Sequence, residues 1–282
     1  MTTSGSAAST LPPRCAGTDP TSVEARFGVR NCQPELPDSF CDYVVPPWAV
    51  DDHGRVRAGA LAVAVDHVLG EVGFLRRPPG HWSLTAELTL DLVGATVRPD
   101  EVLRLTGSPV RLERHSGFAT GTMSDSAGNP VVMATTRTVN VPAERGQARD
   151  SSSPLPVSSS AASLEDLLRV TYRSTADGIS ARLAEPATWT NGFGVLHGGV
   201  WACLAEMVAA EAISSANRDL ATAHVHTSYL RPGVPAAGIT VRASVVRVGR
   251  RFALTQVSGY TDDGTLCTVS TVTARHIEPP VA

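Results

Sequence analysis

Two long segments without proline are apolar at nearly every position. Residues 58–74 and 198–216 are rich in Ala, Val and Leu, and the second ends in a Ser-Ser-Ala-Asn stretch that is typical of a helix stop. Apolar side chains on all sides of such a segment predict a helix that is covered by other elements. Each predicted helix has one carboxylate in its middle, Asp66 in the first and Glu206 in the second.

Runs of β-branched residues follow each predicted helix. In the second half, residues 239–248, 251–260 and 266–274 predict strands, with a turn at Asp262-Asp263-Gly264 before the last one. In the first half, residues 126–129 predict the same turn, followed by a strand over 131–141. One long helix and a meander of antiparallel strands predict an α+β domain in which the sheet wraps the helix.

The two halves of the chain look like diverged copies of each other. Residues 54–67 align with 194–207 without a gap, so that Asp66 falls on Glu206. Residues 108–138 align with 244–274 at another constant offset. Identities are few but collinear, and an internal repeat predicts two domains with the same fold.

Two polar segments suggest the domain boundaries. Residues 1–22 contain 14 Ser, Thr, Pro or Gly residues, and we expect a disordered tail over 1–38. Residues 142–163 contain seven Ser and three Pro, which is typical of a linker. The predicted domains are therefore an N-terminal one over 39–141 and a C-terminal one over 164–282.

Composition excludes several classes of protein. All 24 basic residues of the 282 are Arg and the net charge is −3, so we expect neither nucleic acid nor a membrane surface as partner. No apolar run approaches the roughly 18 residues of a membrane span, and no secretory signal is visible, so we expect a cytoplasmic protein. Five scattered cysteines indicate neither a disulfide framework nor a zinc site, and no metal or cofactor is predicted.

The clearest candidate site precedes the second helix. The loop from Asn191 to Gly199 is rich in glycine and leads directly into the helix, so its backbone N–H groups lie at the positive end of the helix dipole. Such a loop can polarise a substrate carbonyl, with Asn191 and His197 beside it. Glu206 follows nine residues after His197, and a carboxylate buried in an apolar helix is costly unless it is paired or functional.

These residues resemble a known family. The pattern is similar to that of the hotdog-fold thioesterases of the phenylacetate-pathway and 4-hydroxybenzoyl-CoA type, strongly over residues 190–276 and weakly over 54–141. The two halves together resemble a fused double hotdog. The residues that carry the resemblance are Asn191, Gly194, His197, Gly198, Gly199, Glu206, Tyr229-Leu230-Arg231-Pro232 and Val248-Gly249-Arg250.

The resemblance implies hydrolysis of an acyl thioester, carried by coenzyme A or an acyl carrier protein, without metal or redox cofactor. The N–H of Gly198 would polarise the thioester carbonyl, Asn191 would position the carbonyl or the water, and the helix carboxylate would attack or activate water. A non-catalytic acyl-CoA-binding protein and a hotdog hydratase or dehydratase are the alternatives. We also expect copies of the double hotdog to form a homo-oligomer.

Relatives of this type build each site from two hotdogs, which makes this chain asymmetric. The loop with Asn191, His197 and Gly198 would be completed by Asp66, with Ser83 or Thr85 as a hydroxyl partner. Glu206 would instead meet a loop that has lost the expected residues, and we expect that second site to be degraded. The replaced positions are Asp51, Arg57 and Ala58, where Asn, His and Gly belong.

A few other side chains are weaker candidates. His224 and His226 alternate along a predicted strand and would point to one face, either into a polar pocket or to structural partners. The arginines 231, 250 and 251 would meet the phosphates of coenzyme A or remain solvated. Trp201 is expected in the core.

Overall fold

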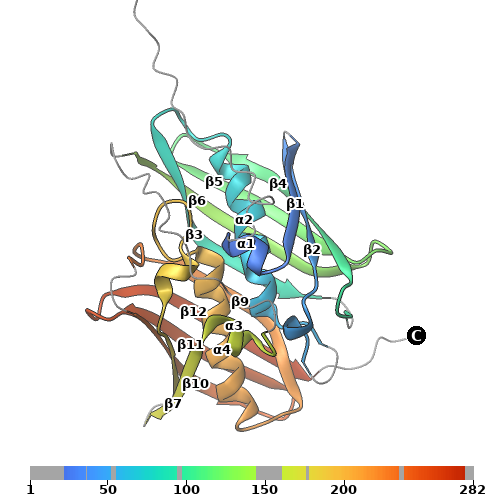
Figure 1. Ribbon diagram of the computed structural model, residues 1–282, viewed down its shortest axis with the longest axis vertical. Helices are drawn as coiled ribbons and strands as arrows, with labels where there is room; N and C mark the ends of the chain where they lie inside the picture. Colours follow the sequence, from blue (N-terminus) through green and yellow to red (C-terminus); the bar gives the residue numbers. More distant parts are fainter. Residues whose placement is uncertain are drawn as a thin grey trace, which may run out of the picture.

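The computed structural model describes residues 22–35, 37–51, 55–93, 97–143, 161–175, 178–234 and 238–276. Two α+β domains follow one another, each with one long helix against antiparallel strands (Figure 1). The N-terminal domain consists of α1 (Val23–Arg26), β1 (Val29–Glu35), β2 (Asp38–Val44), η1 (Pro47–Ala49), α2 (Ala58–Phe74), β3 (His81–Leu92), β4 (Val102–Leu112), β5 (Ser116–Ser124) and β6 (Pro130–Pro142). The C-terminal domain consists of α3 (Leu164–Leu168), β7 (Val170–Thr175), β8 (Gly178–Leu183), η2 (Pro186–Trp189), α4 (Gly198–Ser214), β9 (Leu220–Tyr229), β10 (Ile239–Val248), β11 (Phe252–Thr261) and β12 (Leu266–His276).

The element order of the second domain repeats that of the first, which confirms the predicted internal repeat. All strands join one antiparallel sheet in the order β1-β2-β4-β5-β6-β3-β9-β12-β11-β10-β8-β7, so the two halves mirror each other about the β3·β9 pair. Both copies also have a register shift at equivalent positions of β4 and β10. The shift leaves Val110 and Val246 exposed in the two copies.

The long helices lie where the apolar pattern predicts them. α2 has the expected bounds, and α4 ends at Ser214, two residues before the predicted end. Every residue of α2 except Gly70 is buried, because its own sheet covers one side and α4 covers another. Helices covered on several sides need no polar face, which explains their continuous apolar sequence.

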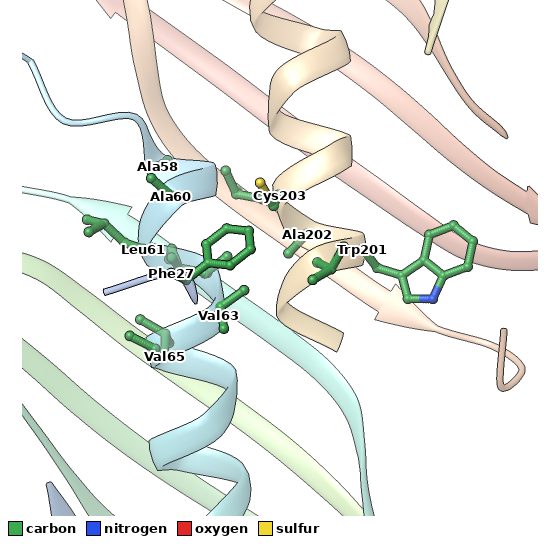
Figure 2. Close-up of a cluster of buried hydrophobic side chains, with 14 of the residues drawn as sticks. Phe27, Ala58, Ala60, Leu61, Val63, Val65, Trp201, Ala202 and Cys203 are labelled. Atoms are coloured by element: carbon green, nitrogen blue, oxygen red, sulfur yellow. The ribbon is translucent and has the colours of Figure 1, made fainter. Parts of the chain in front are cut away.

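Glycines allow α2 and α4 to pack closely. A Cβ atom at Gly59 would lie 3.1 Å from the carbonyl oxygen of Cys203, and one at Gly199 would overlap the backbone at Val63. Figure 2 shows this contact, with Trp201 turned away from α2 toward its own sheet. Trp201 is 2% exposed, as expected of a core residue. The close approach brings the start of α4 against the middle of α2.

The predicted strands and turns are confirmed with small shifts. β10 has the expected bounds, β11 lies one residue later than predicted, and β12 extends to His276. In the first domain the chain turns between β5 and β6 at residues 125–129, as the Ser-Ala-Gly-Asn sequence predicts. Four cysteines lie in the described residues, and all four are free and buried: Cys32, Cys41, Cys203 and Cys267.

The predicted tail over 1–38 is too long. α1 and β1 lie inside it, and Val23, Phe27 and Val29 are buried in the core. The ring of Phe27 packs edge-on against Trp48 and Trp189, one from each domain. This apolar contact stabilises a segment that the prediction had joined to the polar residues 1–22. The N-terminal domain therefore begins at least 16 residues before the predicted residue 39.

Two further expectations concern residues outside the described ranges. The predicted tail over 1–21 is not described, and neither is most of the predicted linker, residues 144–160. Among the described helices, none has the length and apolar character that a membrane span requires.

Candidate active site

The loop before α4 is shaped by its own hydrogen bonds. Thr190 and Leu196 form an isolated antiparallel bridge, and Gly194 has a φ of 72°, a backbone conformation that favours glycine. The side-chain oxygen of Asn191 accepts from the N–H of Phe193 at 3.0 Å. Asn191 is thus tied to its own turn, and its side-chain nitrogen donates to no residue that the structure describes.

Asp66 of α2 meets this loop from the other domain. Its Oδ2 accepts from the N–H of Gly199 at 2.9 Å, and its Oδ1 accepts from the hydroxyl of Thr85 at 2.8 Å. A Cβ atom at Gly198 would lie 2.7 Å from Oδ2, so only glycine fits there without displacing the carboxylate. The hydroxyl partner is Thr85; the Oγ of the other candidate, Ser83, makes no hydrogen bond within the described residues.

Gly198 lies at the first position of α4, next to this carboxylate. Its carbonyl oxygen accepts from the hydroxyl of Tyr229 at 2.8 Å, while its N–H donates to no residue in the described ranges. Burial, assisted by the charge of Asp66, raises the pKa of Tyr229 well above its usual value, so the phenol remains a donor. The N–H of Gly198 is therefore a donor available to a ligand.

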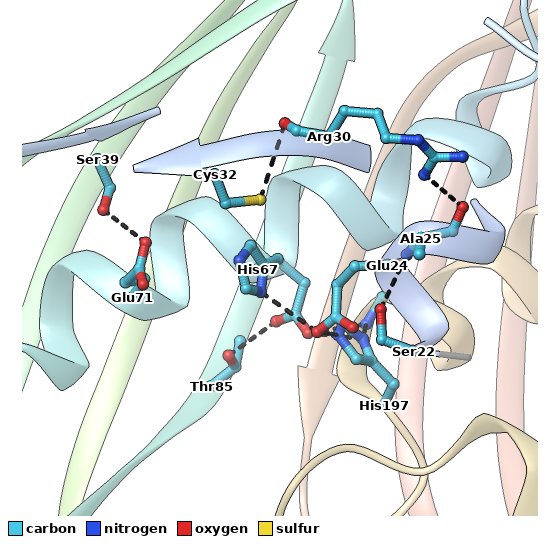
Figure 3. A network of polar contacts seen from close by, with 12 residues as sticks. Ser22, Glu24, Ala25, Arg30, Cys32, Ser39, His67, Glu71, Thr85 and His197 are labelled. Atoms are coloured by element: carbon cyan, nitrogen blue, oxygen red, sulfur yellow. Dashed lines mark hydrogen bonds and ion pairs between the residues drawn. The ribbon is translucent and has the colours of Figure 1, made fainter. Parts of the chain in front are cut away.

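His197 precedes Gly198 and is 4% exposed. Its Nδ1 lies 3.0 Å from the nitrogen of Gly199 and 3.2 Å from Oδ2 of Asp66. Its Nε2 faces Oε1 of Glu24 at 3.5 Å, and the same oxygen lies 3.3 Å from Nδ1 of His67 (Figure 3). A continuous set of polar contacts thus joins Glu24 to Asp66 through His197.

Glu24, which is partly buried, and His67, which is buried, form a pair of opposite charge. Burial alone would raise the pKa of Glu24, but hydrogen bonds to His197 and His67 hold it well below its usual range. Burial alone would lower the pKa of His67, but the Cys32 sulfur, which acts as a thiolate, and the Glu24 carboxylate raise it well above its usual value. Both shifts favour the charged form of the group concerned.

The sequence analysis missed Glu24, because it lies in the segment assigned to the tail. A signal was present: Ser22 caps α1 two residues before Glu24, and Ser163 caps α3 two residues before Glu165. A Ser-x-Glu sequence at the start of both copies extends the repeat toward the N-terminus. Buried Phe27, three residues after Glu24, is a second sign of ordered structure.

The equivalent position in the other copy has a different chemistry. Glu206 accepts from Thr222 at 2.7 Å, as Asp66 does from Thr85. Arg57 takes the place of His197, with one nitrogen 2.8 Å from Glu165 and the other 3.9 Å from Glu206. Although burial opposes its charge, the carboxylates of Glu206 and Glu165 raise the pKa of Arg57 above its already high value. Arg57 therefore holds its proton permanently.

The weaker candidates have structural partners. His224 contacts Asp91 at 2.8 Å and His226 contacts Thr89 at 2.9 Å, and both pairs join β9 to β3 across the domain boundary. Arg231 donates to the carbonyl of Leu266 at 3.2 Å. Within the described residues, no group of three or more His, Cys, Asp or Glu side chains is arranged to hold a metal ion.

Comparison with known proteins agrees with this architecture. A tesB protein of Mycobacterium avium subspecies paratuberculosis aligns over 91% of this chain and 98% of its own, with a TM-score of 0.66 at 10% identity. The acyl-CoA thioesterase II TesB2 of Mycobacterium marinum aligns over 92% of this chain and 99% of its own, with a TM-score of 0.61 at 14% identity. A protein of Alicyclobacillus acidocaldarius described as having a hot dog fold aligns over 92% of this chain and 98% of its own, with a TM-score of 0.59 at 13% identity. The chain has a double-hotdog fold, with two hotdog domains in tandem.

The second domain also has a match in sequence. Residues 193–268 match the Thioesterase superfamily. A putative esterase of Haemophilus influenzae is 34% identical over 84 residues, which are 29% of this chain and 60% of that protein. Both matches agree with the predicted superfamily, and the phenylacetate-pathway or 4-hydroxybenzoyl-CoA subtype stays a prediction.

Proposed function

We propose that this chain hydrolyses acyl thioesters of coenzyme A at a single site between its two domains. The observation that carries the proposal is the contact of Asp66 with Gly199 at 2.9 Å, beside the N–H of Gly198, which donates to none of the described residues. A carboxylate and a backbone donor at a helix N-terminus are the two groups that acyl transfer to water requires. The superfamily match of residues 193–268 supports the same chemistry.

In the proposed reaction, the substrate carbonyl oxygen accepts from the N–H of Gly198. Asp66 takes a proton from a water molecule while the water oxygen bonds to the carbonyl carbon. The carbon–sulfur bond then breaks, and the thiolate takes that proton to give a free thiol and a carboxylic acid. Thr85 and Gly199 fix both oxygens of Asp66, so that the carboxylate is oriented before substrate binds. Asn191 accepts from the N–H groups of Phe193 and Val195 and, in this proposal, shapes the loop.

The second carboxylate, Glu206, does not take part in this proposal. Arg57 neutralises it in place of a histidine, and Ala58 stands where Gly198 stands in the other copy. Buried Glu206 and partly buried Arg57 and Glu165 then form a charge network across the contact between the two domains.

The test is release of free thiol from a panel of acyl-CoA esters, with acyl carrier protein thioesters as a second set. We expect turnover of at least one acyl-CoA ester, and unchanged rates in excess EDTA because the mechanism uses no metal ion. Micromolar binding without turnover would instead support the acyl-CoA-binding alternative. Hydration of an enoyl-CoA double bond without thiol release would support the hydratase alternative.

A further inference from the structure

A partly buried carboxylate that the proposed reaction does not use, 14% exposed, lies behind His197. Oε1 of Glu24 contacts Nε2 of His197 at 3.5 Å and Nδ1 of His67 at 3.3 Å. Glu24 comes from α1, whereas His197 precedes α4 of the other domain. Figure 3 shows the Glu24 carboxylate between the two imidazole rings. Helix α1 of the first domain thus reaches the candidate site of the second domain.

Two protonation states of His197 agree with the contacts of its Nδ1, which faces Gly199 and Asp66. In the neutral state, Nδ1 accepts from the N–H of Gly199 at 3.0 Å. In the charged state, Nδ1 donates to Oδ2 of Asp66 at 3.2 Å. In both states Nε2 carries a proton and faces Glu24. Nδ1 is therefore the nitrogen that can gain or lose a proton, and it is the one beside Asp66.

We propose that Glu24 is a positioning residue that keeps a proton on Nε2 of His197, so that Nδ1 can share the proton which Asp66 takes from water. This inference rests on the proposed thioester hydrolysis. After Asp66 has taken the proton from water, the proton can move from Oδ2 of Asp66 to Nδ1 of His197, 3.2 Å away. The proton returns to Asp66 before the thiolate leaves. Glu24 stabilises the imidazolium during that interval. No proton is gained or lost from outside the reaction.

The charge of Glu24 is maintained by its second partner. His67 lies on α2 one residue after Asp66 and contacts Glu24, while Asp66 contacts the loop before α4. Because the Glu24 carboxylate is shared between the two histidines, its negative charge remains balanced when His197 is neutral. His67 thus supports Glu24 without touching the candidate site itself.

The other copy provides an internal comparison. Glu165 occupies the position of Glu24, Arg57 that of His197 and Glu206 that of Asp66. A nitrogen side chain between two carboxylates is therefore present twice, and of the two only the imidazole of His197 can exchange a proton. Substitution of Glu165 removes a partly buried carboxylate, as substitution of Glu24 does, at a place without proton transfer, which makes it a matched control.

The test compares Glu24→Gln, Glu24→Leu and Glu165→Gln in the full chain with an acyl-CoA ester. Gln keeps an oxygen that accepts from Nε2–H but loses the charge, and we expect kcat to fall about 10-fold with little change in KM. Leu loses both, and we expect a fall of about 100-fold, since orientation of an imidazole by a carboxylate is worth this much or more. Glu165→Gln should change kcat less than about twofold.

A spectroscopic measurement separates positioning from a general loss of stability. In protein with 15N-labelled histidine, assigned with a His197→Gln variant, we expect wild-type His197 to have its proton on Nε2 when neutral. Glu24→Leu should shift this proton toward Nδ1, whereas Glu165→Gln should leave it on Nε2. If Glu24→Leu fails to fold, Glu24→Gln and its kcat remain the deciding comparison.

Unchanged kcat in a folded Glu24→Gln variant would overturn the inference, as would neutral wild-type His197 with its proton on Nδ1. These outcomes differ from failure of the proposed function. If no acyl-CoA is hydrolysed by the wild-type chain, the proposed function is wrong, and the inference falls with it. If Asp66→Asn abolishes turnover while the Glu24 variants keep it, only the role of Glu24 is wrong.

Discussion

The two helix carboxylates are expected to differ sharply when each is neutralised. Asp66→Asn can keep both present hydrogen bonds: its oxygen accepts from Gly199, and its amide nitrogen donates to the hydroxyl oxygen of Thr85. The side chain then has the same size and position but no longer takes a proton from water. Loss of a general base costs about 10² to 10⁴ in rate, so kcat should fall at least about 100-fold, or about 2.7 kcal/mol of transition-state stabilisation.

Glu206→Gln is the matched substitution in the other copy. The amide oxygen can still accept from Thr222, and Arg57 keeps its contact with Glu165 at 2.8 Å. The lost charge pair with Arg57 spans 3.9 Å, so its removal acts on stability and not on the reacting atoms. We expect kcat to change less than about threefold.

The assay is steady-state release of coenzyme A from one acyl-CoA ester at saturating substrate, after both variants have shown melting temperatures near that of the wild type. The melting control is needed because neutralising a buried carboxylate can change stability by about 1–4 kcal/mol in either direction. An inactive Glu206→Gln with a normal Asp66→Asn would reverse the assignment. Equal partial losses would mean two working sites and would refute the claim that Arg57 marks an inactive one.

Three further predictions concern packing, assembly and pH. Gly199→Ala should lower stability by about 1–3 kcal/mol, because the added Cβ overlaps the backbone of α2. Gly192→Ala is the control: the added Cβ has no atom within 4 Å, and the melting curve should not change. Residues 164–282 expressed alone should self-associate or precipitate, since β9 and α4 lose their partners β3 and α2, and a stable monomer in light scattering would contradict this. The stability lost in Glu24→Gln should be largest between about pH 4.3 and 6.5, the unfolded pKa values of Glu and His. Because folding lowers the pKa of Glu24, its charge stabilises the folded state above about pH 4.3. Because folding raises the pKa of His67, its charge stabilises the folded state fully below about pH 6.5, and this stabilisation is lost as pH rises through the raised pKa. Thermal melts of wild type and Glu24→Gln across pH measure the difference, and a difference that does not vary with pH would contradict the charge pair.

The periodicity of the sequence determined most of the secondary structure. α2 and β10 have the predicted bounds, because uninterrupted apolar and β-branched runs are local signals that tertiary contacts did not override. The repeat determined the architecture, since two copies of one pattern must each bury a similar apolar surface. The start of the first domain was misplaced because α1 and β1 are short, and Phe27 between them packs against Trp48 and Trp189, which lie elsewhere in the chain.

The candidate site divides in the same way. The sequence alone brought together Asp66 and the loop at Gly198, because the resemblance implied a site shared between two domains. Only the tertiary structure decided that Thr85 and not Ser83 holds Asp66, and that Asn191 is turned into its own loop. It also decided that Glu24 lies behind His197, 173 positions away in the sequence. Hydrogen bonds between distant segments depend on ångström-scale placement, which close helix packing at Gly59 and Gly199 sets and which no local pattern encodes.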